Sequence, residues 1–450
     1  MASKIFMGNM PELMEKILNN LDKEIRSLYS CALVSRHWCE MSIPIIWRNP
    51  FSFYVFKPMF ISIYISSFED LEEDDVKSIL KEYGIHINFQ NPLFHYVRFL
   101  EILGLDRLNY GVDRWISIHL HDKEQDIEQL KYHVANLLLK IFIKGGVTLS
   151  ELELDSLNKF IEIKPEIFYL LEQNINFFSS IRALSVSLTA LNELKFDDDF
   201  EFIYGSYCKV LVKLLKVLAR SVTKITNMEI TLYDSDYLPQ LCHELAFIIK
   251  SQEHLKYFDF ACALDTRPWE LYGVVLALKS QKDKLKEIKL EGCAYSAEFE
   301  VLRDCENLEV IRILYCSNGI STRFNSKISI LEIRTTGLYN ASGVVQILEK
   351  SGSSLQRFKL IDDYSYFEDD DEDDYSIFKF NKKRGLIQSQ SLLLETLMTS
   401  CPNIVYLYIS DGMMNLMMNR DRGKRKKKKR WKNVLNNLQK YCHQHYNILI

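Results

Sequence analysis

Glycine and proline are scarce in this chain of 450 residues, which contains 16 and 9 of them. Because 26 Phe and 24 Tyr accompany this scarcity, we expect long disorder only in specific tracts. No apolar stretch that would indicate a signal peptide follows Met1. The most apolar window, residues 51–68, is interrupted by Lys57 and Pro58 and is barely long enough to span a bilayer. We interpret this window as buried strand and loop of a soluble protein.

Paired cysteine motifs are also absent. The ten cysteines form no CxxC pair, which favours an intracellular protein with reduced thiols. Cys31, His37 and Cys39 lie close in sequence, but no fourth ligand stands at a suitable spacing for zinc. Residues 442–445 are similarly incomplete as a metal site. The pattern predicts buried structural cysteines and no metal.

Catalytic signatures are missing as well. The chain contains no GxSxG, no Walker-type phosphate loop, no dinucleotide glycine fingerprint and no HExxH. Carboxylates are plentiful, but no spacing marks a pair of them as catalytic. We therefore expect a protein without enzymatic activity of its own and without a cofactor.

Charge is concentrated in two tracts of opposite sign. The formal net charge is −4, and Lys424 to Arg430 is an unbroken basic run, without which 49 basic residues face 60 acidic ones. A basic loop at 420–432 is compatible with a nuclear-import signal, a phosphate-contacting patch or a solvated loop. Since no aromatic residues are interleaved with the basic ones, we do not expect this loop to recognise bases. We expect the protein to be cytoplasmic, nuclear or both. The acidic insertion 362–374 is interpreted as an exposed loop, or alternatively as a recognition loop for a basic partner.

The first fifty residues carry helical patterns. Pro11 suits a first helical turn, and Asp22 would cap a second helix that extends to Trp38, after which Pro44 ends the helical pattern. The first helix has one apolar stripe, formed by Leu13, Ile17, Leu18 and Leu21. So short a segment buries too little surface to close a core alone, so we expect it to complete its core against a partner.

The order of residues in this segment resembles the F-box, the adaptor-docking module of cullin–RING ubiquitin ligases. The resemblance covers Met10 to Trp47, and its most specific part is Leu33-Val34-Ser35-Arg36 followed by Trp38. Met10 stands where the family usually has Leu, and the interval from Pro11 to Ile17-Leu18 is one residue short. The resemblance implies that the Skp-family adaptor binds a set of residues consisting of Pro11, Leu13, Ile17, Leu18, Leu21, Leu28, Cys31, Val34 and Trp38.

A six-residue unit, apolar-x-x-apolar-x-apolar, recurs through the rest of the chain. Between 225 and 355 its starting positions are 30, 30, 23, 20 and 27 residues apart, close to the period of leucine-rich repeats. Apolar spacing typical of helices precedes many copies, such as residues 211–218 and 344–348. The ten units begin at Val97, Leu149, Ile181, Ile225, Leu255, Leu285, Leu308, Ile328, Leu355 and Ile404.

Residues 285–293 and 305–316 resemble the cysteine-containing leucine-rich repeat, in which a cysteine follows the strand and packs beneath it; Cys401 begins a similar unit. A generic α/β domain with chance matches is the alternative. We expect an α/β chain with three parts: an F-box-like helical domain at 1–50, a linker and N-terminal cap at 51–91 with a helix through Val76 and Leu80, and an irregular solenoid of parallel strands and outer helices at 92–450.

Together the two resemblances predict the substrate receptor of an SCF-type ubiquitin ligase. The F-box would bind the Skp-family adaptor, which links to cullin and a RING protein, and the repeats would bind an unknown protein target. Two alternatives stay open: an interaction scaffold without a ligase role, and a nuclear protein that associates with nucleic acid through the lysine run. The outward strand positions predict a target surface consisting of Glu287, Lys289, Arg312, Glu332, Arg334 and Lys359.

Overall fold

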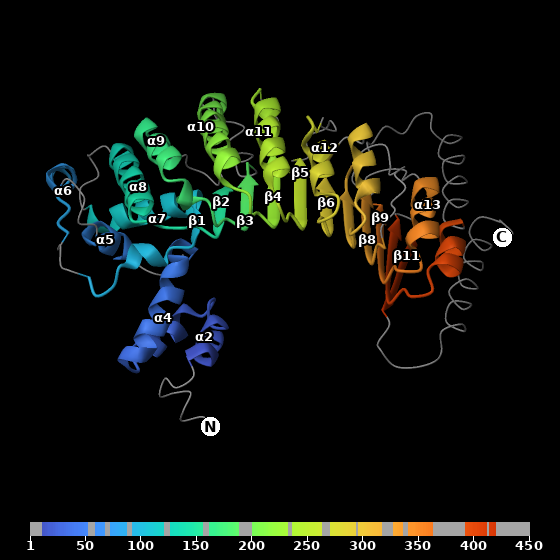
Figure 1. Ribbon diagram of the computed structural model, residues 1–450, viewed down its shortest axis with the longest axis horizontal. Coiled ribbons are helices and arrows are strands. Elements are labelled where there is room, and N and C mark those ends of the chain that lie inside the picture. The colour runs from blue at the N-terminus through green and yellow to red at the C-terminus, as the bar shows by residue number, and fades with distance from the viewer. Residues whose placement is uncertain are drawn as a thin grey trace, which may run out of the picture. The chain divides into compact units, whose positions relative to one another are not determined.

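The computed structural model describes fourteen stretches of the chain. They are residues 11–52, 59–67, 73–87, 92–120, 127–155, 162–188, 200–232, 236–262, 271–293, 296–316, 327–335, 341–362, 392–411 and 414–419. The chain divides into two compact units, residues 1–253 and 254–450. Figure 1 shows both units and labels many of their helices and strands.

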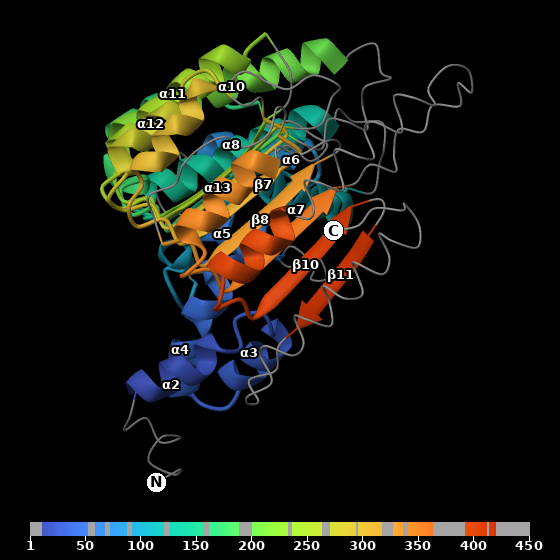
Figure 2. The same ribbon diagram turned by 90° about the vertical axis from the view of Figure 1, so that its right-hand side faces the viewer.

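Unit 1 begins with three short helices, α2 (Pro11–Asn19), α3 (Ile25–Ala32) and α4 (Arg36–Arg48). Helices α2 and α3 each pack against α4 (Figure 2). Pro11 opens the first helix, as its missing N–H allows. The side chain of Ser35 caps α4 by accepting a hydrogen bond from the Trp38 amide at 3.3 Å. Leu18 and Leu28 have no exposed surface, so they form the core of this three-helix module.

Three local predictions for this module were wrong. Asp22 lies in a turn, and α3 starts at Ile25 after Glu24, which makes no capping bond. The second helix ends at Ala32, so Trp38 belongs to a separate helix. Pro44 lies inside α4 and does not end it. Proline removes one helical hydrogen bond, but the buried residues 45–47 directly after it pack into the core, and this packing outweighs the local penalty.

The window 51–68 is helical where the structure describes it, so the expectation of a buried strand was wrong. It contains the end of η1 (Pro50–Ser52) and all of α5 (Met59–Ser66), with Ile61, Tyr64 and Ile65 buried. An almost uninterrupted apolar sequence shows no period, and its length alone does not separate a buried helix from a strand. The predicted helix through Val76 and Leu80 is confirmed as α6 (Glu73–Glu82).

The rest of unit 1 alternates strands with helices. Strands β1 (Ile102–Gly104), β2 (Glu151–Asp155), β3 (Ala183–Ser187) and β4 (Asn227–Leu232) pair in parallel in chain order. The helical elements are η2 (Tyr96–Phe99), α7 (Leu105–His119), α8 (Ile127–Lys144), α9 (Pro165–Gln173), η3 (Ile175–Phe177), α10 (Phe200–Ser221) and α11 (Leu238–Ser251). Helices α8 to α11 lie on one side of these strands (Figure 1).

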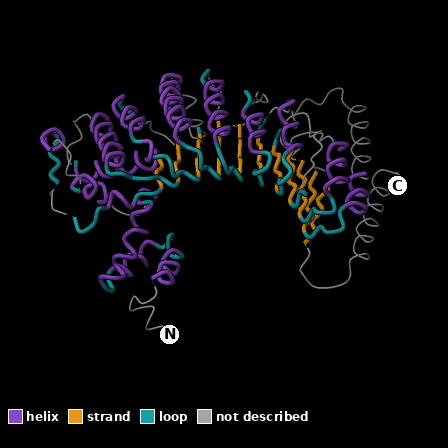
Figure 3. The backbone as a smooth tube through the Cα atoms, in the orientation of Figure 1, coloured by secondary structure: helices purple, strands orange, loops and turns teal. Residues whose placement is uncertain are grey.

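Unit 2 continues the same pattern. Strands β5 (Tyr257–Cys262), β6 (Glu287–Glu291), β7 (Val310–Leu314), β8 (Ile330–Thr335), β9 (Arg357–Asp362) and β10 (Tyr406–Asp411) pair in parallel, and β11 (Met414–Asn419) is antiparallel to β10. Its helical elements are α12 (Val274–Ala277), η5 (Leu278–Gln281), η6 (Ala297–Asp304), α13 (Ala341–Ser351) and residues 392–400. The helices cover one side of the strands (Figure 3).

The six-residue unit predicted the strands closely. Nine of the ten strands from β1 to β10 begin two residues after the start of their unit. Each of these strands therefore contains the second and third apolar residues of its unit. These two residues are two positions apart, so both side chains point into the core. In unit 2, one register row through β5–β10 consists of side chains with no exposed surface: Phe258, Ile288, Ile311, Leu331, Phe358 and Leu407. The first unit differs, since residues 96–99 form η2 and β1 starts only at Ile102. The hairpin partner β11 was not predicted, because it lacks the repeated pattern.

A buried glutamine ties three elements of unit 1 together. The side-chain amide of Gln252, at the end of α11, donates to the carbonyls of Val222 at 2.9 Å and Ile248 at 2.6 Å. Its oxygen accepts from the amide of Ile225 at 2.9 Å, and its side chain is almost fully enclosed. These bonds satisfy backbone groups in the connection from α10 to β4, which no water can reach.

We expect Gln252→Ala to destabilise unit 1 by about 1–3 kcal/mol, because the buried amide of Ile225 loses its partner and the carbonyl of Val222 keeps only the hydroxyl of Ser251. Thermal unfolding and amide hydrogen exchange at Ile225 measure the effect. Gln240→Ala on the same helix is the matched control, since Gln240 is exposed. Equal stability and exchange in the two variants would show that the buried amide contributes nothing.

The prediction of buried cysteines is confirmed for part of the set, because Cys31, Cys39 and Cys316 are only partly buried. Cys293, Cys305 and Cys401 are buried. Burial raises the pKa of the Cys305 thiol to about 12, with smaller contributions from Asp304 and Asp283, and burial alone raises that of Cys401 to about 12. Since the thiolate is the reactive form, both thiols should be inert in the native protein.

Alkylation of the native chain by iodoacetamide at pH 8, read by peptide mass spectrometry, should therefore leave Cys305 and Cys401 unmodified. The same peptides should react fully once denaturant has unfolded the chain. Rapid labelling of either residue in the native state would contradict the burial described here.

Candidate docking surfaces

Four exposed aliphatic residues lie on the three-helix module, and we call them the apolar helical face: Leu13, Ile17, Leu33 and Val34. Leu33 is 87% exposed and Val34 64% exposed, in the turn between α3 and α4. Leu13 and Ile17 lie one helical turn apart on α2, and about two fifths of each is exposed. Large apolar side chains left exposed on so small a module are typical of a protein-binding surface.

The structure separates the predicted adaptor-binding residues into groups. Leu13, Ile17 and Val34 are exposed, whereas Leu18 and Leu28 are enclosed in the core of the module. The intermediate group, partly exposed, consists of Leu21, Cys31 and Trp38. Pro11 opens α2, and its side chain lies outside the described residues. In this conformation Leu18 and Leu28 hold the helices together and offer no surface.

Leu33 was not among the predicted contact residues, although it is the most exposed residue of the apolar helical face. It stands directly before Val34 in the segment Leu33-Val34-Ser35-Arg36, between the end of α3 and the cap of α4. A signal was therefore present in the sequence. An apolar pair directly before a capping serine falls outside both helices, where burial within the module is hardest to achieve.

The module is joined to the strands of unit 1 by packed aromatic and charged groups. The ring of Trp47 lies 5.1 Å from that of Tyr64 and 4.2 Å from that of Tyr96, measured between centroids. The guanidinium of Arg48 lies 3.3 Å from the Glu101 carboxylate, and the Glu101 amide donates to the Arg48 carbonyl at 3.0 Å. The apolar helical face is therefore carried on a module that is packed against the segment leading into β1.

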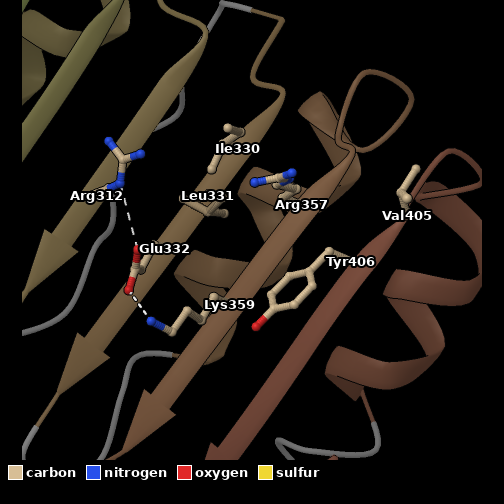
Figure 4. A pocket seen from close by; sticks show the side chains of 8 residues that line it. All are labelled: Arg312, Ile330, Leu331, Glu332, Arg357, Lys359, Val405 and Tyr406. Atoms are coloured by element: carbon tan, nitrogen blue, oxygen red, sulfur yellow. Dashed lines mark hydrogen bonds and ion pairs between the residues drawn. The ribbon is translucent and has the colours of Figure 1, made fainter. Parts of the chain in front are cut away.

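The second candidate surface is the outer side of the strands in unit 2, where four predicted residues form a chain of ion pairs. We call Glu287, Arg312, Glu332 and Lys359 the charged ladder. Arg312 pairs with Glu287 and lies 3.7 Å from Glu332, which also pairs with Lys359 at 2.6 Å (Figure 4). Because parallel register places Arg312, Glu332 and Lys359 side by side, each charge has a partner on a neighbouring strand.

The other two predicted residues of this surface have different partners. Lys289 lies 3.2 Å from Asp259 and 3.1 Å from Glu291. Arg334 donates to the hydroxyl of Tyr315 at 3.4 Å. Burial raises the pKa of Asp259, and Lys289 opposes that rise. Burial lowers the pKa of Lys289, but its bonds to Glu291 and Asp259 outweigh this effect, so the net pKa is raised and the ammonium stays charged.

A hollow of about 460 Å³ lies beside the charged ladder, and we call it the strand pocket. It is lined by Arg312, Ile330, Leu331, Glu332, Arg357, Lys359, Val405 and Tyr406, from strands β7 to β10 and the residue before β10 (Figure 4). Arg357 and Tyr406 were missed from the sequence. The period of two along each strand could have found them, because both stand two positions before a residue at an outward position, Lys359 and Tyr408.

In the part of the chain that the structure describes, no three or more His, Cys, Asp or Glu side chains come together as a metal would need. None of the described helices has both the length and the apolar character to cross a membrane. Within the acidic insertion, residues 363–374 lie outside the described residues, and so does the basic loop 420–432.

Comparison with known protein families identifies one region. Residues 11–52 match the F-box-like family, and the matched range covers α2, α3, α4 and η1. No curated protein matches the chain. The module that bears the apolar helical face is therefore an F-box-like domain.

Proposed function

We propose that this chain is the non-catalytic substrate-recognition subunit of an SCF-type E3 ubiquitin ligase. Its F-box-like domain binds a Skp-family adaptor, which links it to cullin and a RING protein. Its strand region binds a target protein and presents it for ubiquitination. The single observation that carries the proposal is an F-box-like domain whose Leu33 and Val34 stand in solvent.

The exposure of these residues supports adaptor binding on energetic grounds. Burying a large apolar side chain contributes about 1.5–3 kcal/mol. Leu33 gains almost none of this within the chain and Val34 gains only part of it, since they are 87% and 64% exposed. A partner that covers the apolar helical face would supply it.

We further propose that the strand region is a leucine-rich-repeat solenoid of the cysteine-containing type. The apolar-x-x-apolar-x-apolar unit, its spacing of 20 to 30 residues between 225 and 355, and the buried Cys293 and Cys305 support this assignment. In such a repeat the strands offer their outer side to a partner. The charged ladder and the strand pocket lie on that side in unit 2.

The proposed contribution of the chain to ubiquitination is proximity. A receptor that holds a target near the ubiquitin-loaded conjugating enzyme raises the effective concentration of the target's lysines at that enzyme. It needs no catalytic group of its own. The packing of Trp47 and Arg48 against the segment before β1 suits this role, because it restrains the docking module within unit 1. The proposed site of action is the cytoplasm, the nucleus or both, with Lys424 to Arg430 as a candidate import signal.

Leu33→Asp combined with Val34→Asp should reduce co-purification of a Skp-family adaptor about tenfold or more, since an interface residue of this kind contributes at least about 1.4 kcal/mol. The readout is adaptor recovered per mole of tagged full-length chain. Leu93→Asp is the matched control, because Leu93 is 90% exposed and lies outside the F-box-like domain. Leu18→Asp is not informative here, because it places a charge inside the core.

Wild-type chain that recovers no adaptor would overturn the ligase proposal and leave an interaction scaffold as the better description. Equal recovery with the double variant and with Leu93→Asp would instead show that the adaptor does not contact the apolar helical face. Circular dichroism of each variant checks that the helices of the domain persist.

A further inference from the structure

The strand pocket carries an excess of positive charge. Its lining includes three cations, Arg312, Arg357 and Lys359, and one carboxylate, Glu332. Two of the cations are already neutralised, because Arg312 pairs with Glu287 and Glu332, and Lys359 pairs with Glu332. These ion pairs fix the side chains of the charged ladder and leave them little capacity for a further anion.

Arg357 is different from the other two cations. It is exposed, and no hydrogen bond or ion pair joins its guanidinium to any of the described residues. Figure 4 shows its side chain on the same side of the strands as Lys359 and Tyr406. A guanidinium offers a planar fork of donors that matches a carboxylate in two parallel hydrogen bonds. Arg357 is therefore the one cation of the pocket lining that can take an external anion without breaking an existing ion pair among the described residues.

The two residues that flank Arg357 on the adjacent strands are uncharged. In the strand register Arg357 lies between Ile330 on β8 and Tyr406 on β10, so an aliphatic and an aromatic side chain flank it. Val405, which also lines the pocket, is 41% exposed. A ligand held here would bury apolar surface against these three side chains while it pairs with the guanidinium. A hollow of about 460 Å³ falls within the size range of pockets that enclose a ligand group.

We propose that the strand pocket binds an extended protein segment in which an Asp or Glu side chain stands next to a large apolar side chain. The carboxylate pairs with Arg357, and the apolar side chain rests against Ile330, Val405 and Tyr406. This inference deepens the proposed function, since it assigns a chemical class to the target segment. It rests on the strand face being the target surface of the receptor.

A selection of random peptides by the full-length chain, read by sequencing, tests the chemistry. Enriched peptides should carry an acidic residue beside Leu, Met, Phe or Tyr. The best of them, fluorescein-labelled and titrated by anisotropy, should bind Arg357→Glu about tenfold or more weakly, because an ion pair becomes a repulsion. Lys282→Glu, the same change of charge at an exposed position outside the pocket, should leave the affinity within about twofold.

The apolar half of the site has its own variant. Tyr406→Ala should relax the preference for a large apolar side chain in the selection while the preference for the acidic residue persists. Neutral or basic consensus peptides, no enrichment at all, or equal affinity for wild type and Arg357→Glu would each overturn the proposal. Binding of phosphorylated peptides alone, with no affinity for carboxylates, would overturn it too. Because none of these measurements includes the adaptor, their failure is separate from a failure to recover the adaptor.

Discussion

The structure depends on one constraint: a single strand–helix unit cannot bury its apolar side without a neighbour. The inner side chains of each strand align with those of the next, as Phe258, Ile288 and Ile311 do in unit 2, and none of the three retains exposed surface. Each such side chain contributes about 1.5–3 kcal/mol when it is enclosed. Register is therefore decided by the buried rows, because a shift of one residue would turn every inner side chain outward.

The same constraint decides what the outer side of the strands can do. Once the inner rows fix the register, outward residues of neighbouring strands come to lie side by side whatever their chemistry. In unit 2 this alignment joins Arg312, Glu332 and Lys359 into one run of ion pairs. It also sets Arg357 between two uncharged residues, Ile330 and Tyr406, where no carboxylate can reach it from the adjacent strand position. The strand register therefore explains both the ion pairs of the charged ladder and the lack of a carboxylate at the positions beside Arg357.

The F-box-like domain solves its burial problem differently. Its core is closed by Leu18 and Leu28 together with the C-terminal half of α4, while Leu33 and Val34 fall between helices and remain in solvent. Several of its local features could be anticipated, such as Pro11 opening α2. The course of α4 through Pro44 could not, because the penalty of a helical proline is local whereas the burial of Ile45, Ile46 and Trp47 depends on the surrounding fold.

The amino-acid sequence alone determined the positions of nine strands, several of the helices before them and the existence of the N-terminal helical module, because each follows from a short-range period of apolar residues. Only the tertiary structure decided which residues of each pattern reach solvent. In the structure Leu18 and Leu28 are buried in the core and Leu33 is exposed. Four of the charged residues predicted for the target surface form ion pairs with one another. The tertiary structure also brought Arg357 and Tyr406, 49 positions apart in the chain, to adjacent places on neighbouring strands. The reason is physical. The periodicity of apolar residues indicates which side of a helix or strand a residue lies on, but its exposure and its ion-pair partners depend on the elements that pack beside it.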